Sequence, residues 1–137
     1  MNGFDTKIAI VVREDLAGWQ KLNVTAFLTS GIVGSSQNLF GEPYVDADGN
    51  RYNALIIQPV IILGADKRDT RKIYERAMER NIALSLYIED MFKTGHDAAN
   101  REVVTKYSSE ALDVVGLALR EDRKLVDTIT KGARMHP

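Results

Sequence analysis

The stretch Lys7-Ile-Ala-Ile-Val-Val-Arg-Glu-Asp-Leu16 decides the fold class. The run from Lys7 to Val12 is short, apolar and rich in β-branched side chains, which is typical of a strand buried on both faces of a sheet. The residues from Asp15 to Gly18 have the character of a turn, and the hydrophobic spacing changes immediately after them. A strand, a turn and a helix in succession indicate an α/β fold.

The helix after this turn is predicted from the spacing of its apolar residues. Trp19, Leu22, Ala26 and Val33 recur at helical intervals, and the helix is expected to run from about Trp19 to about Gly31. Large aromatic residues at such spacing usually belong to a core. We therefore expect Trp19, and Tyr87 at strand spacing, to lie in the core, and a role as stacking platforms is the alternative.

The middle of the chain predicts a hairpin, a strand and a second helix. Asp48-Gly49 is a favoured turn pair, and it predicts a hairpin over 44–52. Residues 54–63 are strand-forming, but Pro59 cannot donate to a ladder and indicates a bulge or an edge position. Asp66 is the expected N-cap of the next helix, and Asn81 is its expected left-handed end. The residues of this helix expected to face the core are Ile73, Ala77 and Met78.

The rest of the chain alternates in the same way. We expect strands over 82–88 and 114–119, a helix over 95–107 and a short last helix marked by Leu125, Val126 and Ile129. Alternating strands and helices favour a three-layer α/β sandwich, in which a small mixed β-sheet carries helices on both faces. The length suits a single domain over 1–137.

The composition excludes several kinds of function. There are no cysteines, so disulfides, thiolate zinc sites and a cysteine nucleophile are absent. Eighteen Lys and Arg face nineteen Asp and Glu, whereas nucleic-acid binders usually carry a basic excess. There is no signal-peptide pattern and no apolar run long enough to cross a membrane. We expect a cytoplasmic protein, with nucleic acid an improbable partner.

Two segments have the composition of ligand loops but fail on spacing. Asp46-Ala-Asp-Gly-Asn50 places its glycine before the third ligand and lacks the twelfth-position glutamate of a calcium loop. Gly31-Ile-Val-Gly-Ser-Ser36 lacks the lysine and spacing of a phosphate loop. We therefore expect no metal and no cofactor.

Several motifs resemble those of the class II peptidyl-tRNA hydrolases of archaea and eukaryotes. The pattern Val11-Val-Arg-Glu-Asp-Leu16 is similar to the end of their first strand, and Lys21 falls at the lysine that opens their long helix. The helix and strand over 69–88, the motif Ile88-Glu-Asp-Met-Phe-Lys-Thr-Gly95 and the closing segment 115–131 resemble the second half of those enzymes. The resemblance implies their fold over most of the chain.

The departures from this pattern fall on the functional surface. Met91-Phe92 replaces a pair of small residues, Gly95 replaces a glutamine, and Thr25 stands where the helix motif has another glutamine. Residues 96–107 lengthen a short loop, and Arg120-Glu121 replaces a Gly-Pro pair. The chain is thus identified as a member of an uncharacterised bacterial family with this fold, one that kept the scaffold and changed the ligand.

The resemblance implies Lys21, Asp90 and Thr94 as catalytic residues. A lysine in such a cleft holds a phosphate or stabilises an oxyanion, an aspartate positions water, and a hydroxyl binds the substrate carbonyl. Each has a structural alternative: a solvated helix lysine, a strand-end cap for Asp90, and, favoured for Thr94, an N-cap paired with Asp97 in a capping box. His96 has no partner pattern, so a catalytic or metal role is not expected of it.

Three functions follow in order of preference. The first is a small hydrolase acting on an ester or amide bond, with Lys21 and Asp90 in the cleft. The second is a non-catalytic module, either ligand-binding or a homodimer, and the third is a true peptidyl-tRNA hydrolase. A cleft joining Lys21 and Asp90 would favour the first, whereas Met91 and Phe92 filling the cleft would favour the second.

Overall fold

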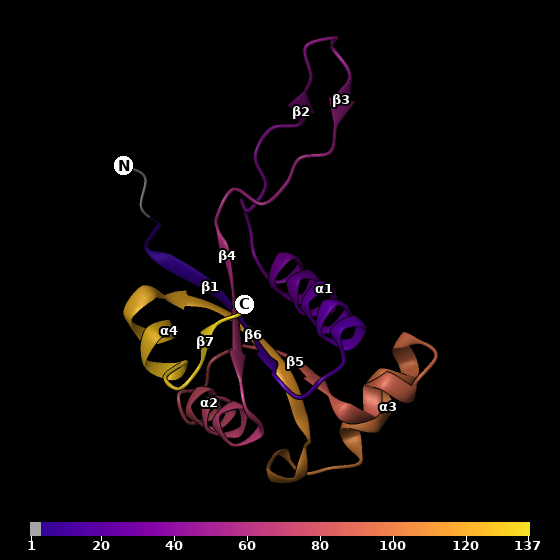
Figure 1. Cartoon of the computed structure of the whole chain (residues 1–137), viewed down its shortest axis with the longest axis vertical. Helices are drawn as coiled ribbons and strands as arrows, with labels where there is room; N and C mark the ends of the chain where they lie inside the picture. Colours follow the sequence, from indigo (N-terminus) through magenta and orange to yellow (C-terminus); the bar gives the residue numbers. More distant parts are fainter. Residues whose placement is uncertain (1–3) are drawn as a thin grey trace.

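The computed structural model describes residues 4–137. A five-stranded sheet with the order β5-β6-β1-β4-β7 forms its centre (Figure 1). The strands are β1 (Thr6–Arg13), β4 (Val60–Ala65), β5 (Ser85–Ile88), β6 (Val114–Asp122) and β7 (Arg134–Met135). β1 pairs parallel with β4 and antiparallel with β6, so the sheet is mixed, as the sequence predicts.

Four helices pack against this sheet. They are α1 (Gly18–Gly34), α2 (Lys67–Glu79), α3 (Asp97–Thr105) and α4 (Arg123–Ile129), with the short 3₁₀ helices η1 (Glu89–Lys93) and η2 (Ser109–Ala111). α1 covers one face of the sheet, and α2 and α4 cover the other, while α3 lies beside η1 at the β5 edge (Figure 1).

Alternate residues of β1 enter the two hydrophobic cores, as a strand buried on both faces requires. The core beneath α1 includes Ile8, Ile10, Val12, Val24, Leu28 and Ile32. The opposite core includes Ala9, Val11, Ile73, Ala77, Val126 and Ile129. Both cores are closed by helices from distant parts of the chain.

The prediction of a helix after the turn is confirmed, but the expected orientation of that helix is wrong. Trp19 is 62% exposed and Leu22 is 75% exposed. The buried side chains of α1 are Val24, Leu28 and Ile32. α1 has apolar residues on both sides, so spacing alone could not select the buried side. Gly116 permits the observed packing, because a Cβ there would lie 2.6 Å from Val24 Cγ1.

The predicted hairpin is confirmed, and Figure 1 shows that it projects far from the sheet. β2 (Tyr44–Val45) pairs with β3 (Arg51–Tyr52), and Gly49 adopts a φ of 87° in the turn. The strand expected over 54–63 begins only at Val60, directly after the proline. Residues 40–57 therefore form a projecting segment, which we call the arm.

α2 follows the prediction at both ends. The Asp66 side chain accepts a hydrogen bond from the Asp69 amide at 2.7 Å, and Asn81 has a φ of 53°. Ile73 and Ala77 are buried, but Met78 is 44% exposed, so its expected place in the core is wrong. Met78 directly follows buried Ala77, and a step of one residue turns a helical side chain well away from the packed stripe.

The second half also follows the predicted order. The strands expected over 82–88 and 114–119 are present as β5 and β6, and the last short helix is α4. β7 and η1 were not anticipated, because a two-residue strand and a 3₁₀ turn leave little periodic signal. Within residues 4–137, no helix has both the length and the apolar character to cross a membrane.

Candidate functional site

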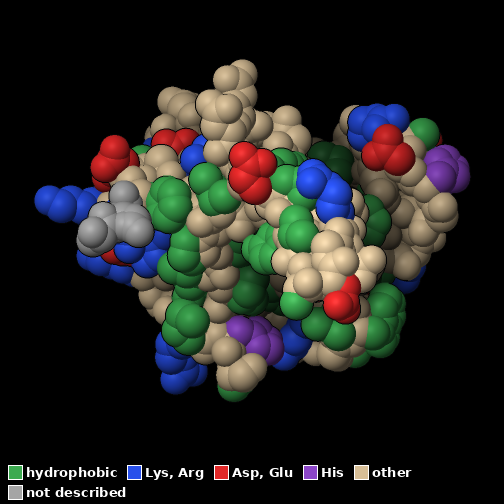
Figure 2. All heavy atoms as spheres, turned by 90° about the horizontal axis from the view of Figure 1, so that it is seen from above, with side chains coloured by type: hydrophobic (Ala, Val, Ile, Leu, Met, Phe, Trp, Pro, Cys, Tyr) green, Lys and Arg blue, Asp and Glu red, His purple; other side chains and the backbone are tan. Residues whose placement is uncertain are grey.

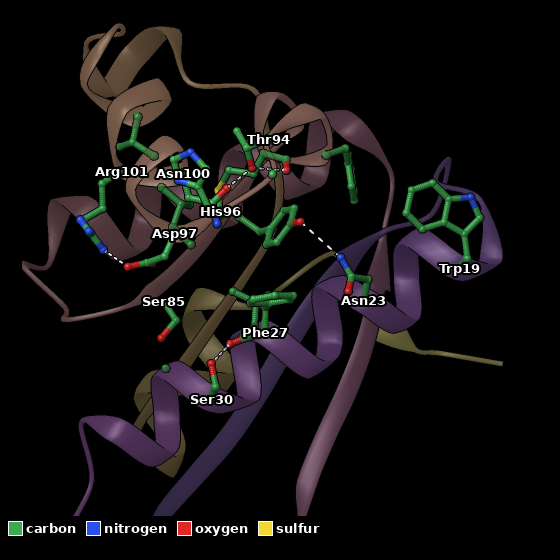
Figure 3. A pocket seen from close by; sticks show the side chains of 18 residues that line it. Trp19, Asn23, Phe27, Ser30, Ser85, Thr94, His96, Asp97, Asn100 and Arg101 are labelled. Atoms are coloured by element: carbon green, nitrogen blue, oxygen red, sulfur yellow. Dashed lines mark hydrogen bonds and ion pairs between the residues drawn. The ribbon is translucent and has the colours of Figure 1, made fainter.

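A cavity of about 530 Å³ lies between α1 and the segment formed by η1 and α3 (Figure 3). α1 lines it with Trp19, Asn23, Phe27 and Gly31, which are spaced four residues apart and so share one side of the helix. β5 contributes Ser85, Leu86 and Tyr87 to the lining. The volume lies within the range of small-molecule sites.

Aromatic side chains form one continuous wall of the cavity. The rings of Trp19 and Phe92 meet edge to face, with their centroids 5.9 Å apart. Phe92 also packs 5.2 Å from Tyr87, which in turn lies 6.1 Å from Phe27. Such pairs add stabilisation beyond the burial of their area. The wall is therefore a preformed apolar surface.

Tyr87 anchors this wall in the core. It is only 4% exposed, and its hydroxyl accepts a hydrogen bond from Asn23 Nδ2 at 3.4 Å. Burial raises the pKa of Tyr87, so the phenol stays neutral and serves as a hydrogen-bonding group. The expected core location is thus correct for Tyr87 and wrong for Trp19.

The opposite rim of the cavity is polar and comes from the start of α3. His96 is the N-cap, because its Nδ1 accepts a hydrogen bond from the Ala99 amide at 3.2 Å. A neutral imidazole that accepts at Nδ1 carries its hydrogen on Nε2 and presents a donor there. Asp97 and Arg101 form an ion pair one helical turn apart on the same rim.

The predicted capping role of Thr94 is wrong, because the helix starts two residues later than expected. Thr94 instead ends η1, where its hydroxyl donates to the Met91 carbonyl at 3.0 Å. The same hydroxyl contacts Asn100 Oδ1 in α3. Thr94 therefore ties the 3₁₀ turn to the helix and keeps the mouth of the cavity in shape.

The close approach of α1 to β5 sets the narrow end of the cavity. A Cβ at Gly31 would lie 2.8 Å from Ser85 Cβ, closer than two such atoms can approach. Any side chain at this position would push the helix and the strand apart. Gly31, which the sequence suggested only as a softened helix end, is thus a packing residue.

The structure brings two of the three predicted catalytic residues together. Asp90 and Thr94 both line a smaller cavity of about 280 Å³, and Thr94 also lines the larger one. Asp90 Oδ2 accepts a hydrogen bond from the Tyr107 hydroxyl at 2.6 Å, and this bond raises the pKa of Tyr107. Lys21 lies two residues from both Trp19 and Asn23, on a side of α1 turned away from the cavity.

Sequence reasoning missed most of the residues that line the larger cavity. Asn23, Phe27 and Asn100 gave no motif, and the exposure of Trp19 was not expected. One signal was available. The aromatic Phe92 stands where the resembled enzymes have a small residue, and it now forms the cavity wall.

The chemical groups around the cavity are aromatic rings and neutral or paired polar side chains. Within residues 4–137, no three His, Asp or Glu side chains gather as metal ligands. In the same range, no hydrogen bond joins a serine or threonine hydroxyl to a histidine or a carboxylate, the arrangement that activates a nucleophile. The arrangement offers an aromatic surface and several hydrogen-bonding groups.

The chain belongs to the family described as Protein of unknown function (DUF2000), which it matches over residues 6–137. Its fold is very similar to the solved structure of the protein of unknown function Atu0240 from Agrobacterium tumefaciens strain C58. The two share 58% sequence identity, with a TM-score of 0.96 over 98% of this chain and 100% of that one. No curated protein matches the chain.

Proposed function

We propose that this protein binds a small aromatic molecule in the cavity between α1 and α3. The observation that carries the proposal is the wall formed by Trp19, Phe92 and Tyr87 in a cavity of about 530 Å³. Trp19 is 62% exposed although it is a large apolar side chain, so a flat ring stacked on it would remove apolar surface from water.

The rim defines the polar part of the ligand. His96 Nε2 and the guanidinium of Arg101 are donors, and Asn100 supplies an amide. Because Asp97 already pairs with Arg101, the rim carries little net charge. These groups suit a ring with carbonyl or carboxylate oxygens, such as an aromatic acid or amide. Apolar cavities with a few convergent polar groups are the usual form of small-molecule sites.

Binding can be followed through Trp19, the only tryptophan of the chain. We would titrate the protein with anilinonaphthalene sulfonate and with a panel of aromatic acids and amides, recording tryptophan fluorescence and thermal stability. A ligand of the native state raises the melting temperature in a concentration-dependent way. We expect saturable quenching of Trp19 by at least one member of the panel.

Phe92→Ala removes the centre of the wall and is expected to weaken binding at least tenfold. The matched control is Phe40→Ala, because Phe40 lies in the arm, outside the cavity, and is 52% exposed. Equal affinity of the two variants for the same ligand would contradict the proposed site. So would the absence of binding across the whole panel.

A second candidate, a small hydrolase acting on an ester or amide, is favoured by the meeting of Asp90 and Thr94 in the smaller cavity. In this reading Asp90 positions a water and Thr94 binds the substrate carbonyl. Lys21 does not line either cavity, which removes the oxyanion partner that the resemblance implies. The binding function therefore stands first.

Activity assays separate the two candidates. The protein would be incubated with a peptidyl-tRNA and with a panel of simple esters. Turnover that is lost in both Asp90→Asn and Thr94→Val would support the hydrolase and overturn a purely binding role. Asp66→Asn, a substitution at the N-cap of α2, is the control for a general effect of removing a carboxylate.

We also propose that the family shares its scaffold with the class II peptidyl-tRNA hydrolases. The similarity of Val11-Val-Arg-Glu-Asp-Leu16 to the end of their first strand supports this, as does the shared order of elements along the chain. A common scaffold does not carry a common activity. The binding proposal rests on the cavity and is independent of this relationship.

A further inference from the structure

The outer side of α1 is apolar and largely uncovered, although one edge of Trp19 packs against Phe92 at the cavity. Trp19 is 62% exposed, Leu22 is 75% exposed, and Ala26 continues their stripe along the helix. Lys21 is the only charged residue of the helix. A surface helix normally carries polar residues on its outer side, and one that is apolar all round is normally buried all round.

The arm is the second unpartnered apolar surface. Ile56 packs against the core, but six other large hydrophobic side chains of the arm are each at least half exposed, and they are Phe40, Tyr44, Val45, Tyr52, Leu55 and Ile57. Its strands pair through only two residue pairs, and an isolated two-stranded hairpin is marginal in water. Seen from above, where the arm projects toward the viewer, hydrophobic side chains lie at the surface among scattered charged ones (Figure 2).

Polar hydrogen bonds nevertheless give the arm a defined shape. Asp46 Oδ1 accepts from the amides of Asp48 at 2.9 Å and Asn50 at 3.0 Å. Asp46 Oδ2 accepts from the Tyr52 hydroxyl at 2.7 Å. The tip is therefore fixed by polar groups, the Tyr52 hydroxyl among them, and the apolar surfaces of the arm remain exposed to contact another molecule.

We propose that two copies of this chain form a symmetric dimer, in which the arm of each copy packs on the outer side of α1 of the other. In such a closed pair, the arm of each copy covers the apolar side of α1 of the other copy, so both exposed surfaces are buried. The arm carries Glu42, Asp46 and Asp48 against the single basic residue Arg51. This negative charge disfavours nucleic acid and anionic membranes, whereas the outer side of α1 carries no charge that would repel it.

The areas are sufficient for a stable dimer. Large aromatic side chains carry roughly 150–250 Å² each and about half of each is exposed here, so the six arm side chains with Trp19 and Leu22 would bury on the order of 800 Å² per protomer. A standard stable interface buries about 800 Å² per partner. A single contact of the arm alone would fall short, whereas the reciprocal contact reaches the required size.

The first experiment measures the mass in solution by light scattering after gel filtration. The wild-type protein is expected at twice the 15.3 kDa chain mass, and Leu22→Glu is expected as a monomer. Met78→Glu changes another exposed apolar side chain, on α2, and is the control that should stay dimeric. Leu22 does not line the cavity, so the variant leaves the proposed ligand site intact.

The second experiment identifies the residues in contact across the dimer. Because the wild-type chain has no cysteine, a crosslink can form only between the introduced cysteines. Leu22→Cys and Leu55→Cys chains are mixed, allowed to exchange subunits and treated with a short bismaleimide. A covalent dimer in the mixture, with little product from either variant alone, supports the exchange of arms. A chain carrying Met78→Cys in place of Leu22→Cys should give no crosslink.

Three outcomes would overturn the proposal. One is a monomeric wild-type protein at all concentrations, and another is a Leu22→Glu variant that remains dimeric. The third is efficient crosslinking of Leu22→Cys with itself, which would place α1 against α1. Sedimentation with phosphatidylcholine vesicles tests whether the arm binds a membrane. Vesicle binding by a monomer would assign the arm to a membrane surface instead of a second copy.

Discussion

Arg13 is the one charged residue, among residues 4–137, with less than a tenth of its surface exposed. Its Nε lies 2.7 Å from Asp15 and its terminal nitrogen 2.8 Å from Asp113. Burial lowers the pKa of Arg13, but the hydrogen bonds to the two carboxylates outweigh it, and the net pKa is raised. The side chain joins the end of β1 to the turn before α1 and to the start of β6.

Arg13→Met should therefore destabilise the fold. We expect a loss of about 1–3 kcal/mol in the free energy of unfolding, below the range for fully buried pairs because both aspartates reach solvent. Urea denaturation followed by circular dichroism measures it. Arg51→Met, at an exposed arginine of the arm, is the control, and an equal effect of the two would show that the buried pairing contributes nothing.

Asp46 supports a pH-dependent expectation. The Tyr52 hydroxyl and then the Asn50 side chain and amide bond its carboxylate, and they lower its pKa from 3.8 to about 2. A lowered pKa stabilises the folded turn above pH 3.8, and that stabilisation is lost as the pH falls toward about 2. An NMR titration of the Asp46 side chain and the Asn50 amide would report the pKa directly.

Tyr52→Phe removes the largest cause of this shift, so it should move the pKa of Asp46 back toward 3.8. Tyr44→Phe is the matched control, because it changes the cross-strand partner of Tyr52 and leaves the hydrogen bonds of Asp46 in place. An unchanged pKa in Tyr52→Phe would assign the shift to the backbone of the turn instead.

Two glycines of α1 provide an expectation at the scale of elements. Gly→Ala within a helix usually stabilises by up to about 1 kcal/mol. At Gly34 nothing lies within 4 Å of the added Cβ, so Gly34→Ala should be neutral or stabilising. At Gly31 the Cβ meets Ser85, so Gly31→Ala should destabilise by about 1–3 kcal/mol as α1 moves off β5.

Chemical denaturation of both variants measures the difference, and ligand titration measures its effect on the cavity. Gly31→Ala should also weaken any ligand of the cavity, because Gly31 and Ser85 both line it. Equal stability of Gly31→Ala and Gly34→Ala would mean that the contact between α1 and β5 relaxes without cost.

The elements were predicted from sequence much better than the faces they bury. The strand at 7–12 and the cap at Asp66 have local causes, namely β-branched runs and a side-chain hydrogen bond, and both are confirmed. The orientation of α1 depends on Gly116, which is remote in sequence. The cavity likewise depends on Phe92 meeting Trp19, a contact that no local pattern encodes.

At the scale of the whole molecule, stability is expected to be unevenly distributed. β1 is paired on both edges and all of its residues from Ile8 to Arg13 are buried, whereas α3 has no buried residue. Local opening requires few broken contacts in α3 and in the arm. The amides of β1 and β6 should therefore exchange only through global unfolding.

Native-state hydrogen exchange tests this expectation. The free energies of opening should be highest and equal in β1 and β6, and clearly lower in α3. The internal comparison is α2, which buries Ile73, Tyr74 and Ala77 and should resemble the sheet. Protection of α3 as strong as that of β1 would show that the cavity rim is part of the cooperative core.

The order β5-β6-β1-β4-β7 also has a consequence for biosynthesis. Among the strands of this sheet β1 is synthesised first, and its neighbour β6 begins only at Val114. Until then, a nascent chain would expose one edge of β1 and leave β5 with no strand to join. Such edges attract other chains. Completion of the sheet therefore waits for the synthesis of β6 and β7, and until then the open edge of β1 is a site of association with other chains.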